Sequence, residues 1–227
     1  QKMVGEISTG ANLAGKADKR PQLSWPNNMS GADVIRFMIK KASKISGGVD
    51  MRNGMNYPQL ISKYTMGAVL YHQACDNYLD EKMTANNKPN NKPYKKGAYY
   101  TGKEHSWDEA FGYWGAAAHT MKLSAKQSYN VAKKKDLKAA DFNNDGVVDL
   151  YKEMTYGHAY YASAFDKGGK TNYLKTVTKA FIDGRKIITN AYGEKLSSSD
   201  LTKVQDLAQV VCSNWAQVIA EAVHKYA

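Results

Sequence analysis

A nine-residue segment, Asp141-Phe-Asn-Asn-Asp-Gly-Val-Val-Asp149, places oxygen-bearing groups at alternate positions around a glycine. A calcium loop of the EF-hand type draws its oxygens from the first, third, fifth, seventh and ninth positions. Here those oxygens would come from the side chains of Asp141, Asn143, Asp145 and Asp149 and from the backbone carbonyl of Val147. Gly146 permits the sharp bend, because a Cβ disfavours positive φ. The spacing therefore predicts a calcium site.

The twelfth position of this loop departs from the EF-hand pattern. An EF-hand has a bidentate Glu there, whereas this chain has Lys152 and places Glu153 one residue later. Either Asp149 closes the shell of ligands, as in a short calcium loop without flanking helices, or Glu153 reaches back from the following helix. Because Asp, Asn and Gly also favour ordinary turns, a turn that binds no ion is the alternative interpretation.

A second group of possible ligands consists of His105, Asp108 and Glu109, which lie within about one helical turn. Imidazole and carboxylate suit a transition metal such as iron or zinc, so these residues form a second candidate metal site. The alternative is a helix start. Glu109 is the third residue after Ser106, as a capping box requires, and Asp108 would favour the positive end of the helix dipole.

The remaining histidines carry weaker signals. His158 shares a helical face with Met154 and Tyr161, so we expect it to face the core or to line a cleft. A buried imidazole needs a polar partner, because leaving it unpaired is costly. His119 and His224 belong to no such group, and we expect them at the surface.

Composition and motifs narrow the function classes. The sequence contains no nucleophile elbow, HExxH, Walker A or dinucleotide-binding pattern, so we expect no enzyme. A net charge of +11 favours an anionic partner such as an acidic envelope polymer. No zinc-finger, RNA-binding or helix-turn-helix signature supports nucleic-acid binding. No apolar run approaches the roughly 18 residues that a membrane helix needs.

The two cysteines leave their redox state open. Cys75 and Cys212 are too few for a disulfide scaffold and lack CxxC spacing. Each falls on the apolar side of a predicted helix, so they are either packed thiols or one bridge in an oxidising compartment. Because the chain starts at Gln1 rather than Met, we expect a processed protein or a fragment that has lost any signal peptide or lipid-anchor cysteine.

The elements that must position these groups are helices. Ser30 with Asp33 predicts one helix start, and Pro58 suits the first turn of a long helix. Apolar residues at helical spacing predict further helices beginning after Ser106, at Leu150, near residue 174 and at Ser199. Residues 84–103 read as an exposed loop. No segment alternates with period two for long enough to propose a sheet.

These elements predict an all-α protein. We expect an irregular N-terminal arm over residues 1–29 and one helical domain over residues 30–227, with the calcium loop at 141–153. Amphipathic helices of this kind pack as an up-and-down bundle.

Three segments resemble a bacterial family of secreted or lipid-anchored proteins that is catalogued only as a domain of unknown function. They are residues 57–71, residues 105–115, and residues 181–185 with the Trp215 helix. Some members of that family insert a calcium loop where residues 141–149 stand here. The block His-Ser-Trp-Asp-Glu-Ala-Phe-Gly-Tyr at 105–113 is the most specific part.

The same block is similar, more distantly, to the Gly-x-His-x-x-Glu segment of imelysin-like proteins. Those are all-helical envelope proteins associated with iron uptake and sometimes labelled peptidases. In this chain Gly102 stands one residue earlier than that pattern requires, and Asp108 replaces its Glu. The resemblance implies an imelysin-like bundle and a secreted, periplasmic or outer-membrane-anchored location.

Together these features predict a calcium-stabilised, non-enzymatic binding protein that captures a metal or a small ligand. One alternative is an imelysin-like metallopeptidase centred on His105, Asp108 and Glu109. Another is a structural or assembly protein of the cell surface, which would self-assemble and meet anionic polymers through its basic face.

Overall fold

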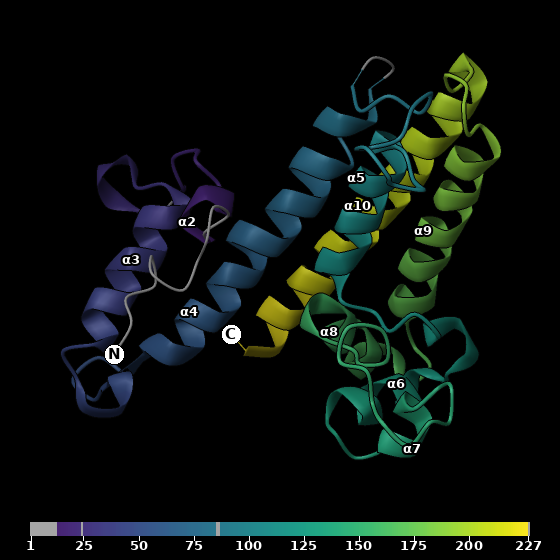
Figure 1. Cartoon of the computed structure of the whole chain (residues 1–227). Coiled ribbons are helices and arrows are strands. Elements are labelled where there is room, and N and C mark those ends of the chain that lie inside the picture. The colour runs from purple at the N-terminus through teal and green to yellow at the C-terminus, as the bar shows by residue number, and fades with distance from the viewer. Residues whose placement is uncertain (1–12, 24, 85–86, 227) are drawn as a thin grey trace. The chain divides into compact units, whose positions relative to one another are not determined.

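Helices dominate the computed structural model of the chain (Figure 1). The structure describes residues 13–23, 25–84 and 87–226. They fall into two compact units, Gln1–Gln73 and Ala74–Ala227. The predicted all-α class is confirmed. Residues 1–12 and 24 of the predicted arm lie outside the described residues, and the predicted domain boundary at residue 30 stays a prediction.

The first unit combines short helices with one small hairpin. Its elements are α2 (Leu13–Lys16), η1 (Pro26–Asn28), α3 (Gly31–Ala42), η2 (Ser46–Gly48), β1 (Val49–Asp50), β2 (Met55–Asn56), α4 (Tyr57–Thr65) and the first part of η3 (Met66–Tyr78). Strands β1 and β2 pair antiparallel, with Val49 opposite Asn56. Strands of two residues are too short to produce an alternating pattern, which is why the sequence predicted no sheet.

Local signals place the helices of this unit. The predicted capping box is confirmed, because Ser30 Oγ accepts a hydrogen bond from the Asp33 N–H and the Asp33 carboxylate accepts one from the Ser30 N–H. Pro58 lies in the first turn of α4, as predicted. The core of the unit is small and consists of buried Val34, Met38 and Tyr57 with partly buried residues around them.

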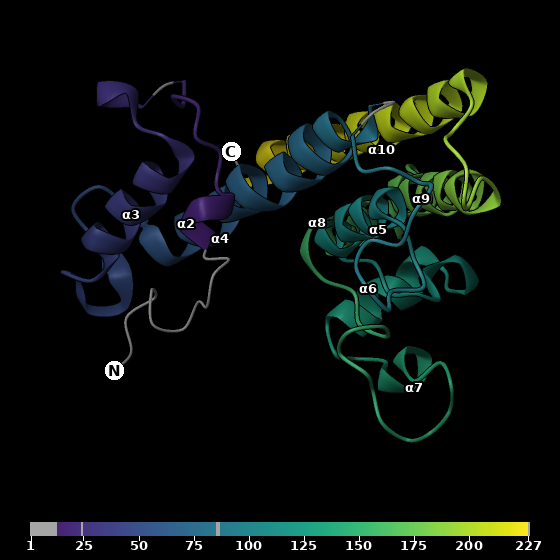
Figure 2. The same ribbon diagram turned by 45° about the horizontal axis from the view of Figure 1, so that its top comes forward.

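The second unit holds the long helices. Its elements are the end of η3, η4 (Glu81–Met83), α5 (Gly102–Trp114), η5 (Thr120–Lys122), α6 (Ala125–Ala132), α7 (Leu137–Ala140), α8 (Gly157–Asp166), α9 (Tyr173–Asn190) and α10 (Ser198–Tyr226). Helices α9 and α10 pack along each other, and α5 and α8 pack against α9. Figure 2 shows α6 and α7 together beside this group, with α6 packed against α8.

Buried tryptophans form the core of the second unit. The Trp107, Trp114 and Trp215 side chains are fully buried. The rings of Trp114 and Trp215 meet edge to face, with centroids 4.9 Å apart, so α5 and α10 share one aromatic contact. Within the described residues, no helix combines the length and the apolar content needed to span a membrane.

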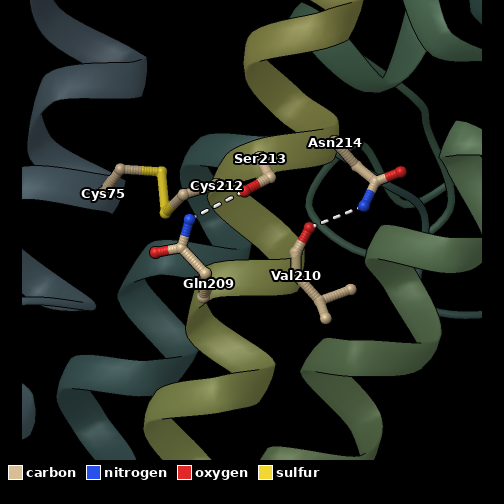
Figure 3. Close-up of a disulfide and its surroundings, with 6 residues drawn as sticks. All are labelled: Cys75, Gln209, Val210, Cys212, Ser213 and Asn214. Atoms are coloured by element: carbon tan, nitrogen blue, oxygen red, sulfur yellow. Dashed lines mark hydrogen bonds between the residues drawn. A yellow bond between two sulfur atoms is a disulfide. The ribbon is translucent and has the colours of Figure 1, made fainter.

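A disulfide joins two helices of this unit (Figure 3). Cys75 of η3 is bonded to Cys212 of α10, so of the two redox states that the sequence left open the structure has the bridge. Beside it, Gln209 Nε2 donates to Ser213 Oγ at 2.8 Å, one turn along α10. A bridge between residues 137 positions apart stabilises the fold mainly by restricting the unfolded chain.

Two predicted helix starts are wrong. Helix α5 begins at Gly102 instead of after Ser106, because Thr101 and Glu104 form the capping box, and Ser106 is buried inside the helix. Helix α8 begins at Gly157 instead of Leu150, whose side chain is 61% exposed. The intervening Glu153 carboxylate accepts hydrogen bonds from the loop before it, so residues 150–156 form turns and extended chain.

Candidate functional site

The predicted calcium loop folds around the backbone N–H of Asp145. That N–H donates to Asp141 Oδ1 and to Asn143 Oδ1, each at 3.1 Å, so these two oxygens lie on the same side of the loop. Asp141 Oδ2 also accepts from the Gly146 N–H at 3.0 Å. Asn143 Nδ2 donates to Asp145 Oδ2 at 2.7 Å. Three of the predicted ligands therefore meet at one place.

Backbone conformation gives the loop its bend. Gly146 has a φ of 82°, in the left-handed region, which confirms the predicted turn there. A Cβ on Gly146 would meet no atom within 4 Å, so backbone conformation and not space favours glycine. Asn144, with a φ of 57°, contributes a second left-handed position. The Val147 N–H donates to Asp145 Oδ1 at 2.8 Å, which continues the turn.

Glu153 joins the two ends of the loop. Its Oε1 accepts from the Phe142 N–H at 3.0 Å, and its Oε2 accepts from the Asp149 N–H at 2.8 Å. Glu153 is only 5% exposed, whereas Lys152 points to solvent and lies 3.5 Å from an Asp149 oxygen. Glu153 thus reaches back into the loop, as one of the two sequence interpretations required, but from a turn and not from a helix.

The loop rests on a small apolar cluster and on one histidine. Buried Leu123, Val131, Ala140 and Met154 form the cluster, with Val148 packed against it. His119 stacks on Phe142 with ring centroids 5.0 Å apart, and its Nε2 lies 2.9 Å from the Ala139 carbonyl. The expected surface position of His119 is therefore wrong. It is buried, and it contacts the loop from the position just before η5.

The donor set of the loop suits a hard cation. A carboxylate offers about four lone-pair sites, so Asp141 and Asp145 keep acceptor capacity beyond their bonds to backbone N–H groups. Within the described residues, the loop contains no three carboxylates whose oxygens all lie within 4.8 Å of one another. Calcium accepts amide and backbone oxygens together with carboxylates. A cation here would thus also need Asn143 and the Val147 carbonyl.

The second predicted group of ligands does not share one centre. His105 Nε2 lies 3.0 Å from Glu109 Oε1, whereas Asp108 Oδ1 accepts from Arg185 Nε at 2.8 Å. Within the described part of the chain, none of the three belongs to a cluster of metal-type ligands. The predicted capping role of Glu109 is also wrong, because Glu104 caps α5.

Arg185 of α9 is the partner that sequence spacing could not supply. Besides Asp108, it donates from Nη1 to Oε1 of the buried Glu104 at 2.5 Å. Burial raises the pKa of Glu104, but the Thr101 N–H and the Arg185 guanidinium outweigh it and hold that pKa below its ordinary value. Arg185 therefore ties the first two turns of α5 to α9 through two carboxylates.

His105 also belongs to a stack of aromatic rings. Its imidazole lies nearly parallel to the Tyr94 ring at 3.9 Å between centroids, and the Tyr100 ring lies 5.7 Å away. Tyr94 and Tyr100 come from the loop that precedes α5. Neither tyrosine was predicted as a site residue from the sequence, although two tyrosines on either side of Gly97 in a short loop could have indicated a turn that pairs them.

Two of the segments that carried the family resemblance, residues 105–115 and 181–185, pack against each other. Trp107 Nε1 donates to the Phe181 carbonyl at 2.8 Å, and their rings meet edge to face. One turn along α9, Gly184 leaves the space that the Trp107 ring fills, because a Cβ there would overlap three ring atoms. The block at residues 105–113, the most specific part of the resemblance, therefore lies where α5 packs against α9 and forms an ion pair with it.

Comparison with known proteins identifies the family of the chain. A family model described as Domain of unknown function (DUF4856) matches residues 46–220. The chain belongs to this family. The DUF4856 match includes both the loop at 141–153 and the contact between α5 and α9, so both regions lie in the family domain. No curated protein and no solved structure matches the chain.

Proposed function

We propose that this DUF4856 protein is a calcium-stabilised, non-enzymatic binding protein of the bacterial envelope or exterior. The observation that carries the proposal is the loop of residues 141–153. Asp141 and Asn143 present oxygens to the Asp145 N–H, the Asp145 carboxylate accepts from Asn143 Nδ2, and Gly146 has the left-handed conformation that such a loop requires. The ligands proposed are Asp141, Asn143, Asp145, Asp149, the Val147 carbonyl and Glu153.

Electrostatics gives calcium a structural role in this loop. Asp141, Asp145, Asp149 and Glu153 bring four carboxylates into one short segment, and like charges oppose a compact loop unless a cation compensates them. Binding to the folded state alone stabilises that state by about 2.7 kcal/mol when calcium is a hundredfold above Kd. The loop packs on the Leu123 cluster through Val148 and would order that side of the second unit.

An extracellular location is supported by the disulfide. Bridges such as Cys75–Cys212 persist in oxidising compartments and are rare where thiols are kept reduced. Extracellular calcium modules work with Kd values on the order of 10⁻⁴–10⁻³ M. The proposal therefore places this protein in the periplasm, on the outer membrane or outside the cell, within an imelysin-like group of helical bundles.

A binding role, in preference to a metallopeptidase centred on His105, is supported by how that residue is engaged. His105 pairs with Glu109 and stacks on Tyr94, while Asp108 pairs with Arg185, so Asp108 is directed to a different partner from the other two proposed ligands. Capture of iron, zinc or a small ligand remains part of the proposal. Elemental analysis of the purified protein tests the metal, and peptide hydrolysis that disappears in His105→Ala would contradict the non-enzymatic role.

Thermal melting in millimolar calcium and in EGTA tests the central claim. We expect chelation to lower the melting temperature of the unmodified chain and of the control Asp206→Ala, which removes an exposed carboxylate from α10. Asp145→Ala should melt at the same temperature under both conditions. Identical melting of the unmodified chain with and without calcium would contradict the calcium site.

A further inference from the structure

The segment between η4 and α5 concentrates positive charge and tyrosine. From Lys82 to Lys103 the sequence contains six lysines and neither Asp nor Glu. The lysines are Lys82, Lys88, Lys92, Lys95, Lys96 and Lys103. Tyr94, Tyr99 and Tyr100 are interleaved with them. This segment therefore accounts for a large part of the net charge of +11.

Buried polar contacts hold the base of this segment. The Asn90 side chain is buried, and its Nδ2 donates to the Ile188 and Ala191 carbonyls at the end of α9. Asn90 Oδ1 accepts from Thr101 Oγ1 at 2.7 Å. Lys103 is also buried and donates from Nζ to the Thr84 and Asn87 carbonyls at 2.9 and 3.0 Å. These bonds fix the two ends of the loop against α9 and α5.

Beyond this base the chain reverses direction, which brings the rings of Tyr94 and Tyr100 together. Pro93 and Thr101 form an antiparallel bridge, and the Tyr94 N–H donates to the Tyr100 carbonyl at 2.8 Å. The Tyr94 and Tyr100 rings stack at 5.9 Å, which makes with His105 the aromatic platform of residues 94, 100 and 105. Tyr99 beside it is 97% exposed.

The carboxylates that follow the segment on α5 do not compensate its lysines. Arg185 binds Glu104 and Asp108, and His105 pairs with Glu109. Lys92, Lys95 and Lys96 are exposed on the loop. The loop therefore presents the exposed Lys92, Lys95 and Lys96 beside aromatic rings that are already positioned, so ordering these rings costs little on binding.

We propose that this loop, through Lys95, Lys96, Tyr99 and the aromatic platform, binds an acidic polysaccharide. The proposal rests on the binding role stated above and names its ligand class. Lysine ammonium groups attract the carboxylates of acidic sugars, and a tyrosine ring offers an apolar face for a pyranose ring together with a hydroxyl group. The exposed part of the loop carries no Leu, Ile, Phe or Trp to enter a membrane. No zinc-finger, RNA-binding or helix-turn-helix signature in the sequence supports nucleic acid as the partner.

Calorimetric titration with a hexamer of galacturonic acid tests the proposal. It is done in EGTA and about 0.1 M salt, where charges more than about 10 Å apart are screened. We expect binding of this hexamer and none of maltohexaose, a neutral sugar of equal length. Lys95→Glu/Lys96→Glu should weaken binding about tenfold or more. Tyr99→Ala removes an exposed ring and should weaken binding several-fold without changing the circular dichroism spectrum.

The matched control is Lys126→Glu/Lys138→Glu, which makes the same charge change on exposed lysines of α6 and α7. It should bind the hexamer like the unmodified chain. An equal loss in this control would overturn the proposal, because the attraction would then be net charge alone. Binding to phosphatidylglycerol vesicles or to a thymidine hexanucleotide, with none to the uronate, would overturn it as well.

The calcium proposal and this one can fail independently. Because the titration is done in EGTA, hexagalacturonate binding does not depend on an occupied calcium loop. Asp145→Ala should bind the hexamer normally while losing its melting response to calcium. If the chain does not bind the hexamer but still responds to calcium, the polysaccharide site is rejected and the proposed calcium site is not.

Discussion

The proposed calcium loop at residues 141–153 and the contact between α5 and α9 both contain bonded carboxylates, but the partners of these carboxylates lie at very different sequence separations. In the loop, the side chains of Asp141, Asp145 and Glu153 bond to groups 2 to 11 residues away. In the helical contact, Asp108 and Glu104 reach Arg185 across 77 and 81 residues. The first arrangement follows from spacing in the sequence, whereas the second exists only once the fold has formed.

This difference in sequence separation predicts that mutations in the two regions change the stability of the protein by different amounts. The α5–α9 contact includes the buried Trp107 ring and the buried Glu104, so disturbing it should lower the stability of the whole second unit. The loop is mostly exposed apart from Glu153 and the residues packed beneath it, so disturbing it should cost less and should depend on calcium.

The largest effect is expected from adding one methyl group at the helical contact. Gly184→Ala would place a Cβ inside the Trp107 ring, which is held by its bond to the Phe181 carbonyl. Because neither the ring nor the α9 backbone can move freely, we expect a loss of about 3 kcal/mol in the free energy of unfolding. Urea denaturation followed by tryptophan fluorescence measures this loss.

Two other glycines serve as controls for that comparison. Gly112 lies in α5 with no atom within 4 Å of an added Cβ, so Gly112→Ala should be neutral or slightly stabilising. Gly146→Ala in the loop should cost about 1 kcal/mol, because of its positive φ and not because of crowding. A Gly184→Ala variant as stable as Gly112→Ala would contradict the packing described for Trp107.

The same difference explains which elements the sequence could predict. Thr101-x-x-Glu104 and Ser106-x-x-Glu109 fit the capping-box pattern equally well. What selects Thr101 is its bond to Asn90, which is itself bonded to the end of α9 about 100 residues later. Because no local pattern contains the bond between Thr101 and Asn90, the start of α5 was predicted several residues late.

The structure of residues 141–153 was also predictable only in part from local sequence. Its oxygen spacing and its glycine turn were predictable, because backbone and ligands are neighbours in sequence. The helix predicted from Leu150 assumed that the apolar spacing of Met154 and His158 extends back to that residue. Instead the Glu153 carboxylate accepts hydrogen bonds from the Phe142 and Asp149 N–H groups, and the helix begins only at Gly157.

An intermediate effect is expected from acid, through a histidine in the core next to Trp215. His158 is 4% exposed, and burial lowers its pKa to about 3. In the unfolded chain this pKa is about 6.5, so below that pH the unfolded state binds a proton that the folded state does not. The stabilisation is therefore complete above pH 6.5 and is lost as pH falls toward 3. Between pH 7 and pH 5 the loss should be about 2 kcal/mol.

Urea denaturation in EGTA at these two pH values measures that loss without a contribution from calcium. His158→Phe should lack most of the pH dependence. Asp145→Ala should keep it, because the described rings that contact the His158 imidazole belong to Tyr161 and Trp215 and not to the loop. Equal pH dependence in His158→Phe and the unmodified chain would assign the acid sensitivity to other groups.

The smallest effect should separate two roles of carboxylates within the loop. Glu153 uses both oxygens to accept backbone N–H groups, so Glu153→Gln keeps one acceptor and turns an amide donor toward the other N–H. We expect a loss of about 1 kcal/mol even in EGTA, because both bonds are made to backbone N–H groups and not to a cation. Asp145→Ala should cost less than this in EGTA and should abolish the response to calcium. Glu194→Gln, at an exposed position, controls for the lost charge. A Glu153→Gln variant that is silent in EGTA would contradict the role of Glu153 in joining the ends of the loop.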